Sequence, residues 1–250
     1  MMLTDPVFYA LAIPAIILLG LGKGGFSGFG SAALPLLALT MSPVQAAAIM
    51  LPIMIVQDVV GVWSFRKTWD GNVLWVMLPG AVAGIVLGWL LAAQVSANAV
   101  MAALGAISIL FALQRLWVER GGRIAASASS PPWIGTLLGV VSGFTSQIAH
   151  AGAPPFQMWV IPKRLDHLTF AGTAAIFFAI VNWMKVPAYM ALGQFTRENM
   201  LTAAALLPLA IGSTFAGVVL VRRVTGTRFY TVIYLLMIFV GAKLLWDALA

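Results

Sequence analysis

Long apolar runs, separated by short polar connectors, occupy nearly the whole chain. Uncharged stretches cover residues 6–22, 24–57, 71–114, 124–162 and 199–221, and a membrane-spanning helix needs only about 20 residues. Several stretches are therefore long enough for two crossings. The alternation of apolar and polar residues that is typical of membrane barrel strands is absent, so helices remain the way to satisfy backbone groups in lipid. The pattern predicts an all-α fold, a polytopic transmembrane helix bundle.

The composition excludes a soluble domain and several kinds of chemistry. Hydrophobic residues make up 62% of the chain and charged residues 8%, with a mean hydropathy of +1.01, so most of the apolar surface must face lipid. The absence of cysteine excludes thiol relays, disulfides and Cys-ligated metals. The net charge of +7 comes from basic residues in the connectors. The positive-inside bias explains them there, and we expect no nucleic-acid partner.

A weak internal repeat divides the chain into two halves. Residues 25–27 (Gly-Phe-Ser) match 143–145 (Gly-Phe-Thr), residues 78–81 match 207–210, and Gly88 matches Gly217. Between the halves, residues 119–130 form the longest stretch of polar and small residues, and two prolines follow it. We predict a first transmembrane repeat over residues 1–118, a cytoplasmic linker over 119–130 and a second transmembrane repeat over 131–250.

Four basic clusters predict the orientation of the halves. They are expected on the cytoplasmic side and consist of Arg66 and Lys67, of Arg115, Arg120 and Arg123, of Lys163 and Arg164, and of Arg222, Arg223 and Arg228. Residues 131–162 must then return to their own side, as a hairpin of two half-helices interrupted at 149–155 would. Residues 20–30 interrupt the first apolar stretch in the same way, with about fifteen apolar residues before and about ten after, each short of a full span.

Each half is then a broken hairpin followed by three spanning helices. The six predicted spans cover residues 44–65, 72–93, 97–117, 166–191, 199–221 and 228–247. An odd number of crossings inverts the second half, and both termini are expected outside the cytoplasm. Eight ordinary spans with parallel repeats are the alternative, because the positive-inside rule is a bias. Gly80, Gly84 and Gly88 predict a helix-packing stripe, which Ser213 and Gly217 repeat.

The first break is the strongest local signal for a binding site. Residues 20–30 contain six glycines in eleven positions, where a helix continues poorly and the backbone can approach a ligand. Discontinuous helices with matching breaks in both halves mark transporter binding sites. A half-helix starting near Ser31 would point its positive end at the break, and Lys23 would add a full charge. The predicted substrate-binding residues of this half are Lys23, Gly24, Gly25, Ser27 and Ser31. Close helix packing by the glycines and snorkelling of Lys23 to an interface are the alternatives.

The second break supplies polar side chains. Thr145, Ser146, Gln147 and His150 precede two prolines, and we expect them to coordinate oxyanion oxygens opposite the first break. His150 has two interpretations. It is either a donor to the anion that also titrates and couples to protons, or a buried, hydrogen-bonded histidine without such a role. The other histidine, His167, lies beside cytoplasmic basic residues, so no metal site and no cofactor are predicted.

Asp58, Asn182 and Lys185 are polar residues inside predicted spans. Asp58 lies eight residues before Arg66, roughly 12 Å inside the membrane boundary, and an intramembrane carboxylate is a functional candidate by default. Asn182 falls near the equivalent place in the second half, and Lys185 shares its helix face. We predict Asn182 and Lys185 as substrate-binding residues and Asp58, with His150, as coupling or gating residues. A structural ion pair is the alternative for Asp58 and Lys185.

As a set, these residues resemble the TauE/SafE sulfite-exporter family, bacterial and archaeal membrane proteins with two repeats. The resemblance covers nearly the whole chain. In the first half it rests on residues 24–28 (Gly-Gly-Phe-Ser-Gly), Pro35, Pro43, Pro52, Asp58, Arg66 and Lys67 before Asp70, and 78–80. In the second half it rests on Gly143, Asn182, Lys185, Pro187, Tyr189, Gly193 and 207–208. The resemblance implies outward transport of sulfite or organosulfur anions such as sulfoacetate or sulfolactate. Residues 146–150 depart from the more glycine-rich second break of many members, which leaves the substrate open.

The predicted function is export of a small sulfur-containing anion through a midplane site formed by the two breaks. Moving one negative charge outward across an inside-negative potential gains about 2.3 kcal/mol per 100 mV, so efflux needs no coupled ion. An anion channel and a proton-coupled uptake permease are the alternatives. No Gly-x-Ser-x-Gly or His-Glu-x-x-His motif supports an intramembrane enzyme. The expected location is the cell inner (cytoplasmic) membrane. The expected partners are the small anion and the lipid bilayer, and a homodimer is left open.

Overall fold

The computed structural model describes residues 5–26, 29–92, 94, 96–122, 130–221 and 227–249. The described residues form helices and no strand, which confirms the all-α fold. The helices in chain order are α1 Pro6–Lys23, η2 Phe29–Ala32, α2 Ala33–Leu37, α3 Pro43–Phe65, α4 Gly71–Ala92, α5 Ala97–Glu119, α6 Pro132–Ala149, α7 Ala153–Val160, η3 Ile161–Lys163, α8 His167–Ala191, α9 Arg197–Val221 and α10 Thr227–Leu249. Among the described residues, α1, α3, α4, α5, α8 and α9 are long and apolar enough to span a membrane.

The long helices lie where the hydrophobic pattern predicts them. α3, α4, α5, α8, α9 and α10 agree with the six predicted spans to within two residues at each end. Polar side chains accept hydrogen bonds from backbone amides at the starts of α3, α4, α5, α8 and α9. The Ser42 hydroxyl accepts a hydrogen bond from the Gln45 amide at 3.2 Å, and the Asp166 carboxylate accepts from the Leu168 and Thr169 amides, both at 3.1 Å. Because each helix satisfies its own backbone hydrogen bonds, these bounds depend mainly on local sequence.

The first break is present but shorter than the predicted span of residues 20–30. α1 continues through Gly20 to Lys23, and the chain turns at Gly25, whose φ of 121° is readily adopted only by glycine. Gly20 is part of the helix, and its lack of a side chain allows α1 to pack closely against α9. A Cβ at Gly20 would lie 2.0 Å from the Ser213 hydroxyl oxygen of α9. The glycine run therefore serves helix packing as well as the turn.

The half-helix predicted to start near Ser31 is wrong in form. Residues Phe29–Ala32 form a single 3-10 turn, and α2 adds only five residues. Such a short helix sums few peptide dipoles, so it provides no strong positive end for an anion. The second break is also shorter than predicted, because α6 ends at Ala149 and α7 begins at Ala153.

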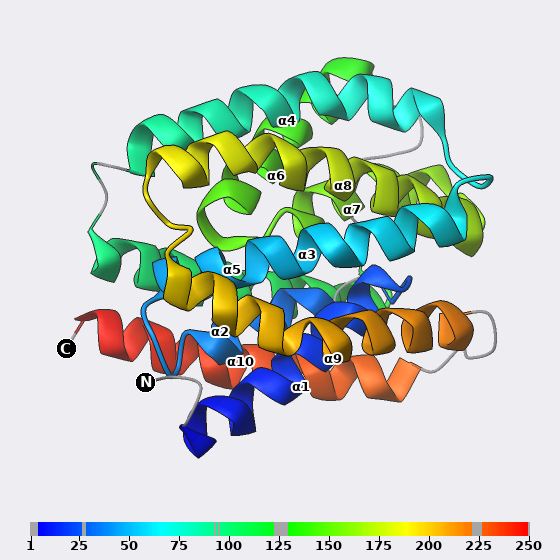
Figure 1. The fold of residues 1–250 in the computed structure, drawn as a ribbon. Helices are drawn as coiled ribbons and strands as arrows, with labels where there is room; N and C mark the ends of the chain where they lie inside the picture. Colours follow the sequence, from blue (N-terminus) through cyan, green and yellow to red (C-terminus); the bar gives the residue numbers. More distant parts are fainter. Residues whose placement is uncertain are drawn as a thin grey trace.

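The same order of elements occurs on both sides of the linker: a long helix, a short helix and three long helices. α4 packs along α6, α1 along α9, α5 along α10, and α3 lies between α8 and α9. Both termini lie at one end of the bundle (Figure 1). Asp58 and Asn182 lie equally far from the starts of α3 and α8, as the repeat predicts. The match of Gly25 with Gly143 is wrong in position, because Gly25 follows α1 whereas Gly143 lies inside α6.

The glycine stripe of α4 packs against the backbone of α6. A Cβ at Gly80 would lie 2.0 Å from the Thr136 carbonyl oxygen, and one at Gly84 would lie 2.0 Å from the Val140 carbonyl oxygen. These contacts confirm the predicted packing role. Because residues later in α4 contact residues later in α6, the two helices run parallel.

α1 and α9 make the corresponding contact. Gly20 meets Ser213, and Gly24 meets Gly217, where an added Cβ would lie 2.5 Å from the Gly217 Cα. These two helices are parallel as well. α3 and α8, in contrast, are antiparallel, since Asp58 contacts Asn182 while a residue nearer the end of α3, Phe65, lies beside the start of α8 at Gly172.

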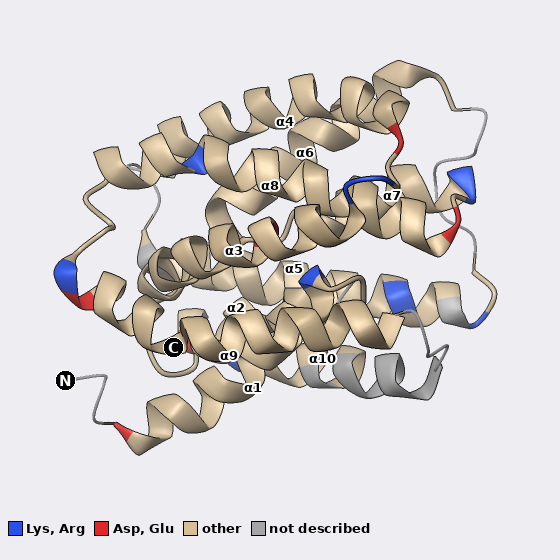
Figure 2. Cartoon of the chain, turned by 45° about the vertical axis from the view of Figure 1, so that its right-hand side comes forward, with Lys and Arg blue, Asp and Glu red and all other residues tan. Residues whose placement is uncertain are grey.

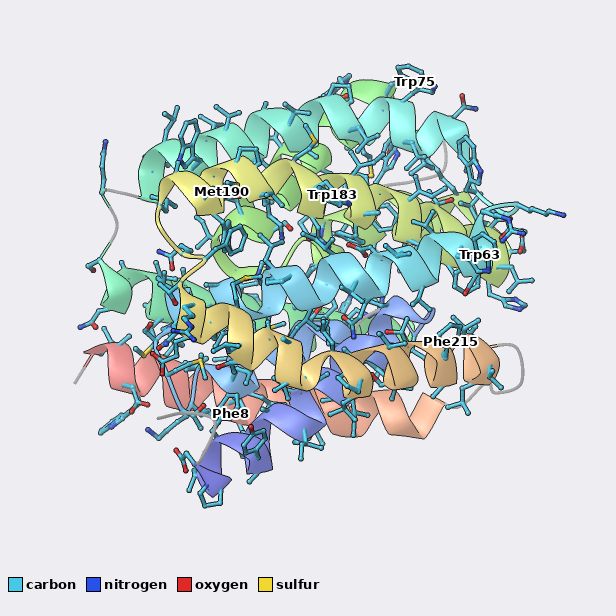
Figure 3. The ribbon with its side chains drawn as sticks, in the orientation of Figure 1. Phe8, Trp63, Trp75, Trp183, Met190 and Phe215 are labelled. Atoms are coloured by element: carbon cyan, nitrogen blue, oxygen red, sulfur yellow. The ribbon has the colours of Figure 1, made fainter. Side chains whose placement is uncertain are left out.

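Charged positions lie mostly at helix ends and in connectors (Figure 2). Many large apolar side chains are exposed on the outside of the bundle. Trp75, Trp63 and Met190 are 82%, 67% and 65% exposed and point away from the bundle (Figure 3). Such a surface is stable in contact with lipid and unstable in water.

Candidate functional site

A cavity of about 90 Å³ lies where the first break, the second break and α8 meet. Its polar lining comes from both halves of the chain and consists of Lys23, Ser31, Ser146, His150, Asn182 and Lys185. Its apolar and glycine lining consists of Leu19, Gly22, Gly25, Gly30, Met54, Ala153, Phe170, Ala171, Ala174, Ala175 and Phe178. The cavity therefore joins charged groups to a largely apolar wall.

Lys23, the last residue of α1, forms an ion pair with Asp58 of α3. The Asp58 side chain is buried, and its second oxygen accepts a hydrogen bond from the Asn182 amide at 2.6 Å. The Lys23 side chain retains 13% exposure, toward the cavity, and its ammonium lies 5.8 Å from the centre of the Phe178 ring. The carboxylate thus has two donors and balances the charge of Lys23.

Lys185 is completely buried and has different neighbours. Its ammonium contacts the Ser146 carbonyl oxygen at 3.3 Å, the Ser146 hydroxyl oxygen at 3.2 Å and His150 Nδ1 at 2.8 Å. Three neutral acceptors suit the three N–H groups of an ammonium. Among the described residues, no carboxylate lies within ion-pair distance of Lys185.

His150 ends α6 in the left-handed conformation, with φ of 50°. Its Nε2 lies 2.9 Å from the Ala47 carbonyl oxygen, which can only accept. His150 therefore donates from Nε2 and receives the Lys185 ammonium at Nδ1, so the ring is neutral. With both nitrogens engaged, His150 has no free N–H for an anion in this structure.

The structure brings most of the predicted site residues together but leaves some out. Gly24, Thr145 and Gln147 do not line the cavity. Gly24 packs on α9, and the Thr145 hydroxyl donates to the Ala151 carbonyl oxygen at 2.9 Å, where it stabilises the second break. The Gln147 side chain packs against Gly88 of α4. Ser27 lies outside the described residues.

The apolar wall of the cavity was missed from the sequence. It comes mainly from Phe170, Ala171, Ala174, Ala175 and Phe178, which continue the helix face of Asn182 and Lys185 at spacings of three and four residues. That periodic spacing is a signal that could have identified the wall, since the polar residues already fixed the face.

Beyond Lys185, the bundle is closed toward the end of α8. The Tyr189 hydroxyl donates to the Gln147 carbonyl oxygen at 3.2 Å. The Tyr189 ring stacks on His150 and on Phe195, with ring centres 6.0 and 6.2 Å apart. The cavity instead extends toward the start of α8, which follows the basic connector of Lys163 and Arg164.

A comparison with known protein families matches nearly the whole chain, including the residues around the cavity. The family model described as Sulfite exporter TauE/SafE matches residues 12–244. The chain belongs to the TauE/SafE sulfite exporter family. The match includes both breaks, Asp58 and both cavity lysines. No curated protein and no solved structure matches the chain. TauE/SafE is a family of membrane transporters for sulfite and related anions, so the chain is a multi-pass membrane protein of a transporter family.

Proposed function

We propose that this TauE/SafE chain exports a small sulfur-containing anion, sulfite or an organosulfonate such as sulfoacetate, and that the cavity between the two breaks binds it. The observation that carries the proposal is Lys185, a buried ammonium without a carboxylate partner among the described residues. A buried charge is costly unless it is paired. A transported anion in the cavity would supply the missing partner.

The residues proposed to bind the anion are Lys185, Ser146 and Asn182. The Ser146 hydroxyl accepts from Lys185 and keeps its own hydrogen for the anion, and the Asn182 amide has a second N–H beside the one given to Asp58. Lys23 contributes less than the sequence predicted, because Asp58 balances its charge. His150 contributes indirectly, because its Nδ1 accepts from the Lys185 ammonium. Gly25 and Ser31 line the cavity.

We further propose that the halves are inverted repeats that move relative to each other around a site near the bilayer midplane. The observation that supports this is the direction of two equivalent helices. α3 and α8 are each the first long helix after a break, and they run antiparallel, as inversion of one half requires. The contact between Tyr189 and Gln147 would have to open for the anion to leave on the far side.

Export is the direction that an inside-negative potential favours, by about 2.3 kcal/mol per negative charge per 100 mV. The proposed location is the inner membrane, with the basic connectors in the cytoplasm. Proton-coupled uptake is the second candidate. The observation that favours it is Asp58, a buried carboxylate bound to Lys23 at the edge of the cavity, since such a group can carry a proton.

Flux into and out of liposomes tests the proposal. Sulfite, sulfoacetate, taurine, thiosulfate and sulfate are compared with and without a membrane potential and a pH gradient. We expect saturable flux of sulfite or sulfoacetate that follows the potential. Flux that follows only the pH gradient would favour uptake, and non-saturating flux would favour a channel.

A variant pair locates the site. Lys185→Met should weaken binding of the transported anion by about tenfold or more, because it removes the charged donor. The matched control is Lys243→Met, which removes an exposed lysine of α10 that pairs with Asp247. Equal affinities for Lys185→Met and wild type would contradict the site.

Cysteine labelling tests the arrangement of the repeats, because the chain contains no cysteine. Single cysteines at Met2 and Ser127 are expected to react from opposite sides of the membrane. Labelling of both positions from the same side would exclude inverted repeats.

A further inference from the structure

We infer that the cavity selects anions by their charge, and that Asp58 sets a preference for singly charged over doubly charged anions. The inference rests on the proposed function, since it concerns the same cavity. It makes Asp58 a determinant of specificity that acts through Lys23 and not through contact with the anion.

The charges around the cavity can be counted from their contacts. With an anion bound beside them, Lys23 and Lys185, which line the cavity, are each counted as one positive charge, and Asp58, which pairs with Lys23, as one negative charge. His150 is neutral, because it donates to a carbonyl oxygen through one nitrogen and accepts from Lys185 through the other. No other acidic or basic side chain of the described residues lines the cavity. The surplus is one positive charge.

A surplus of one positive charge matches one negative charge on the ligand. The three charged groups are at least largely buried among helices, where water screens them weakly and a net charge is costly. A monoanion brings the cluster to neutrality. A dianion of the same size leaves one uncompensated negative charge and must also lose a larger hydration shell.

The apolar wall points to the same kind of ligand. Phe170, Phe178 and Ala174 face the cavity from α8 and offer no hydrogen-bond donor to a second anionic group. An anion with one charged head at Lys185 and a short apolar body would satisfy both sides of the cavity. Among the anions of the proposed function, this favours a small sulfonate with one negative charge, or sulfite in its singly protonated form, over the dianion sulfoacetate.

Asp58 can be altered without replacing a side chain that lines the cavity. It does not line the cavity, and its oxygens bind Lys23 and Asn182. Asp58→Asn removes the negative charge while keeping a planar group of the same size, so the surplus becomes two positive charges. Removing Lys23 at the same time, in Lys23→Met/Asp58→Asn, returns the surplus to one.

The test compares two probes that differ in charge but little in size, ethanesulfonate and sulfoacetate, both fully ionised at neutral pH. The measured quantity is the ratio of their dissociation constants for purified protein, because a ratio within one variant is insensitive to partial loss of folded protein. We expect wild type to favour ethanesulfonate by about tenfold or more. Asp58→Asn should shift the ratio toward sulfoacetate by at least tenfold, and the double variant should return it to the wild-type value.

Two results would overturn the inference. One is a wild-type preference for sulfoacetate, which needs no variant and holds even if Asp58→Asn fails to fold. The other is a ratio that stays the same in Asp58→Asn although both probes bind. Failure of the proposed function gives a different result, because wild type would then bind neither probe nor sulfite. Lys185→Met lowers the surplus to zero and is expected to weaken both probes, sulfoacetate more than ethanesulfonate, which distinguishes a charged site from the absence of any site.

Discussion

Two lysines face the same cavity from the two halves of the chain, yet their neighbours differ. Lys23 of α1 pairs with a buried carboxylate, whereas Lys185 of α8 contacts only a carbonyl oxygen, a hydroxyl group and a neutral histidine. The first lysine is balanced within the protein, whereas the second has no carboxylate within ion-pair distance among the described residues. Both lysines were predicted as anion ligands from their positions in the sequence. Their surroundings differ because packing brings an acidic residue to one of them and not to the other.

The two chain breaks differ in a related way. The first turns at Gly25, which has no side chain to offer a ligand, while the second turns at His150, which holds Lys185 in place. The second half therefore supplies most of the polar groups of the cavity.

The largest effect is expected when Lys23 loses its charge. Lys23→Met leaves Asp58 buried with Asn182 as its remaining donor, and breaking one side of a buried pair typically costs about 3–5 kcal/mol. The stability of the purified protein in detergent, followed by thermal or denaturant unfolding, measures this loss. A variant as stable as wild type would mean that the pair does not stabilise the fold.

The double variant Lys23→Met/Asp58→Asn is the control for that prediction. It removes both charges, so we expect it to recover about 2 kcal/mol or more of the loss, a coupling that a double-mutant cycle measures directly. Additive losses in the two single variants would contradict the ion pair.

A smaller loss of stability is expected for Lys185→Met. The substitution leaves the Ser146 carbonyl group and His150 Nδ1 without a donor, at about 1–3 kcal/mol, but it also removes a buried charge that has no carboxylate partner. The same unfolding measurement applies. If Lys185→Met proved more destabilising than Lys23→Met, the contrast between the two lysines would be reversed.

Tyr189→Phe should cost about 1 kcal/mol, because it removes one hydrogen bond to the Gln147 carbonyl oxygen and keeps the stacked ring. Anion affinity is expected to stay within about twofold of wild type, since Tyr189 does not line the cavity. A tenfold loss of affinity in a calorimetric titration would place the binding site nearer to the end of α8.

The smallest effect is expected at Lys243, which forms an exposed pair with Asp247 one helical turn away. Exposed pairs at this spacing contribute about 0.3–0.5 kcal/mol. Lys243→Met should therefore unfold within about 0.5 kcal/mol of wild type. A loss comparable to that of Lys23→Met would show that burial is not what separates the two ion pairs.

The sequence predicted the helices and much of the cavity, and its errors have identifiable causes. The predicted spans match α3 to α5 and α8 to α10, and Asn182 and Lys185 line the cavity as expected. The sequence did not decide whether an anion or Asp58 pairs with Lys23, because Lys23 and Asp58 are 35 residues apart along the chain. Thr145 and Gln147 were predicted as ligands from their polarity, but Thr145 donates to the Ala151 carbonyl oxygen and the Gln147 side chain packs against Gly88 of α4, so neither lines the cavity.

By itself, the sequence determined that this chain is a bundle of membrane helices of the TauE/SafE family with a break in each half. Those features depend on local properties: apolar run length, glycine and proline at the interruptions, and polar residues at helix starts. The tertiary structure alone decided which lysine is balanced and how short the breaks are. The physical reason is that a charge in a packed interior is governed by groups within a few ångströms. Those groups come from helices up to 124 residues apart in the chain, as Asp58 and Asn182 do.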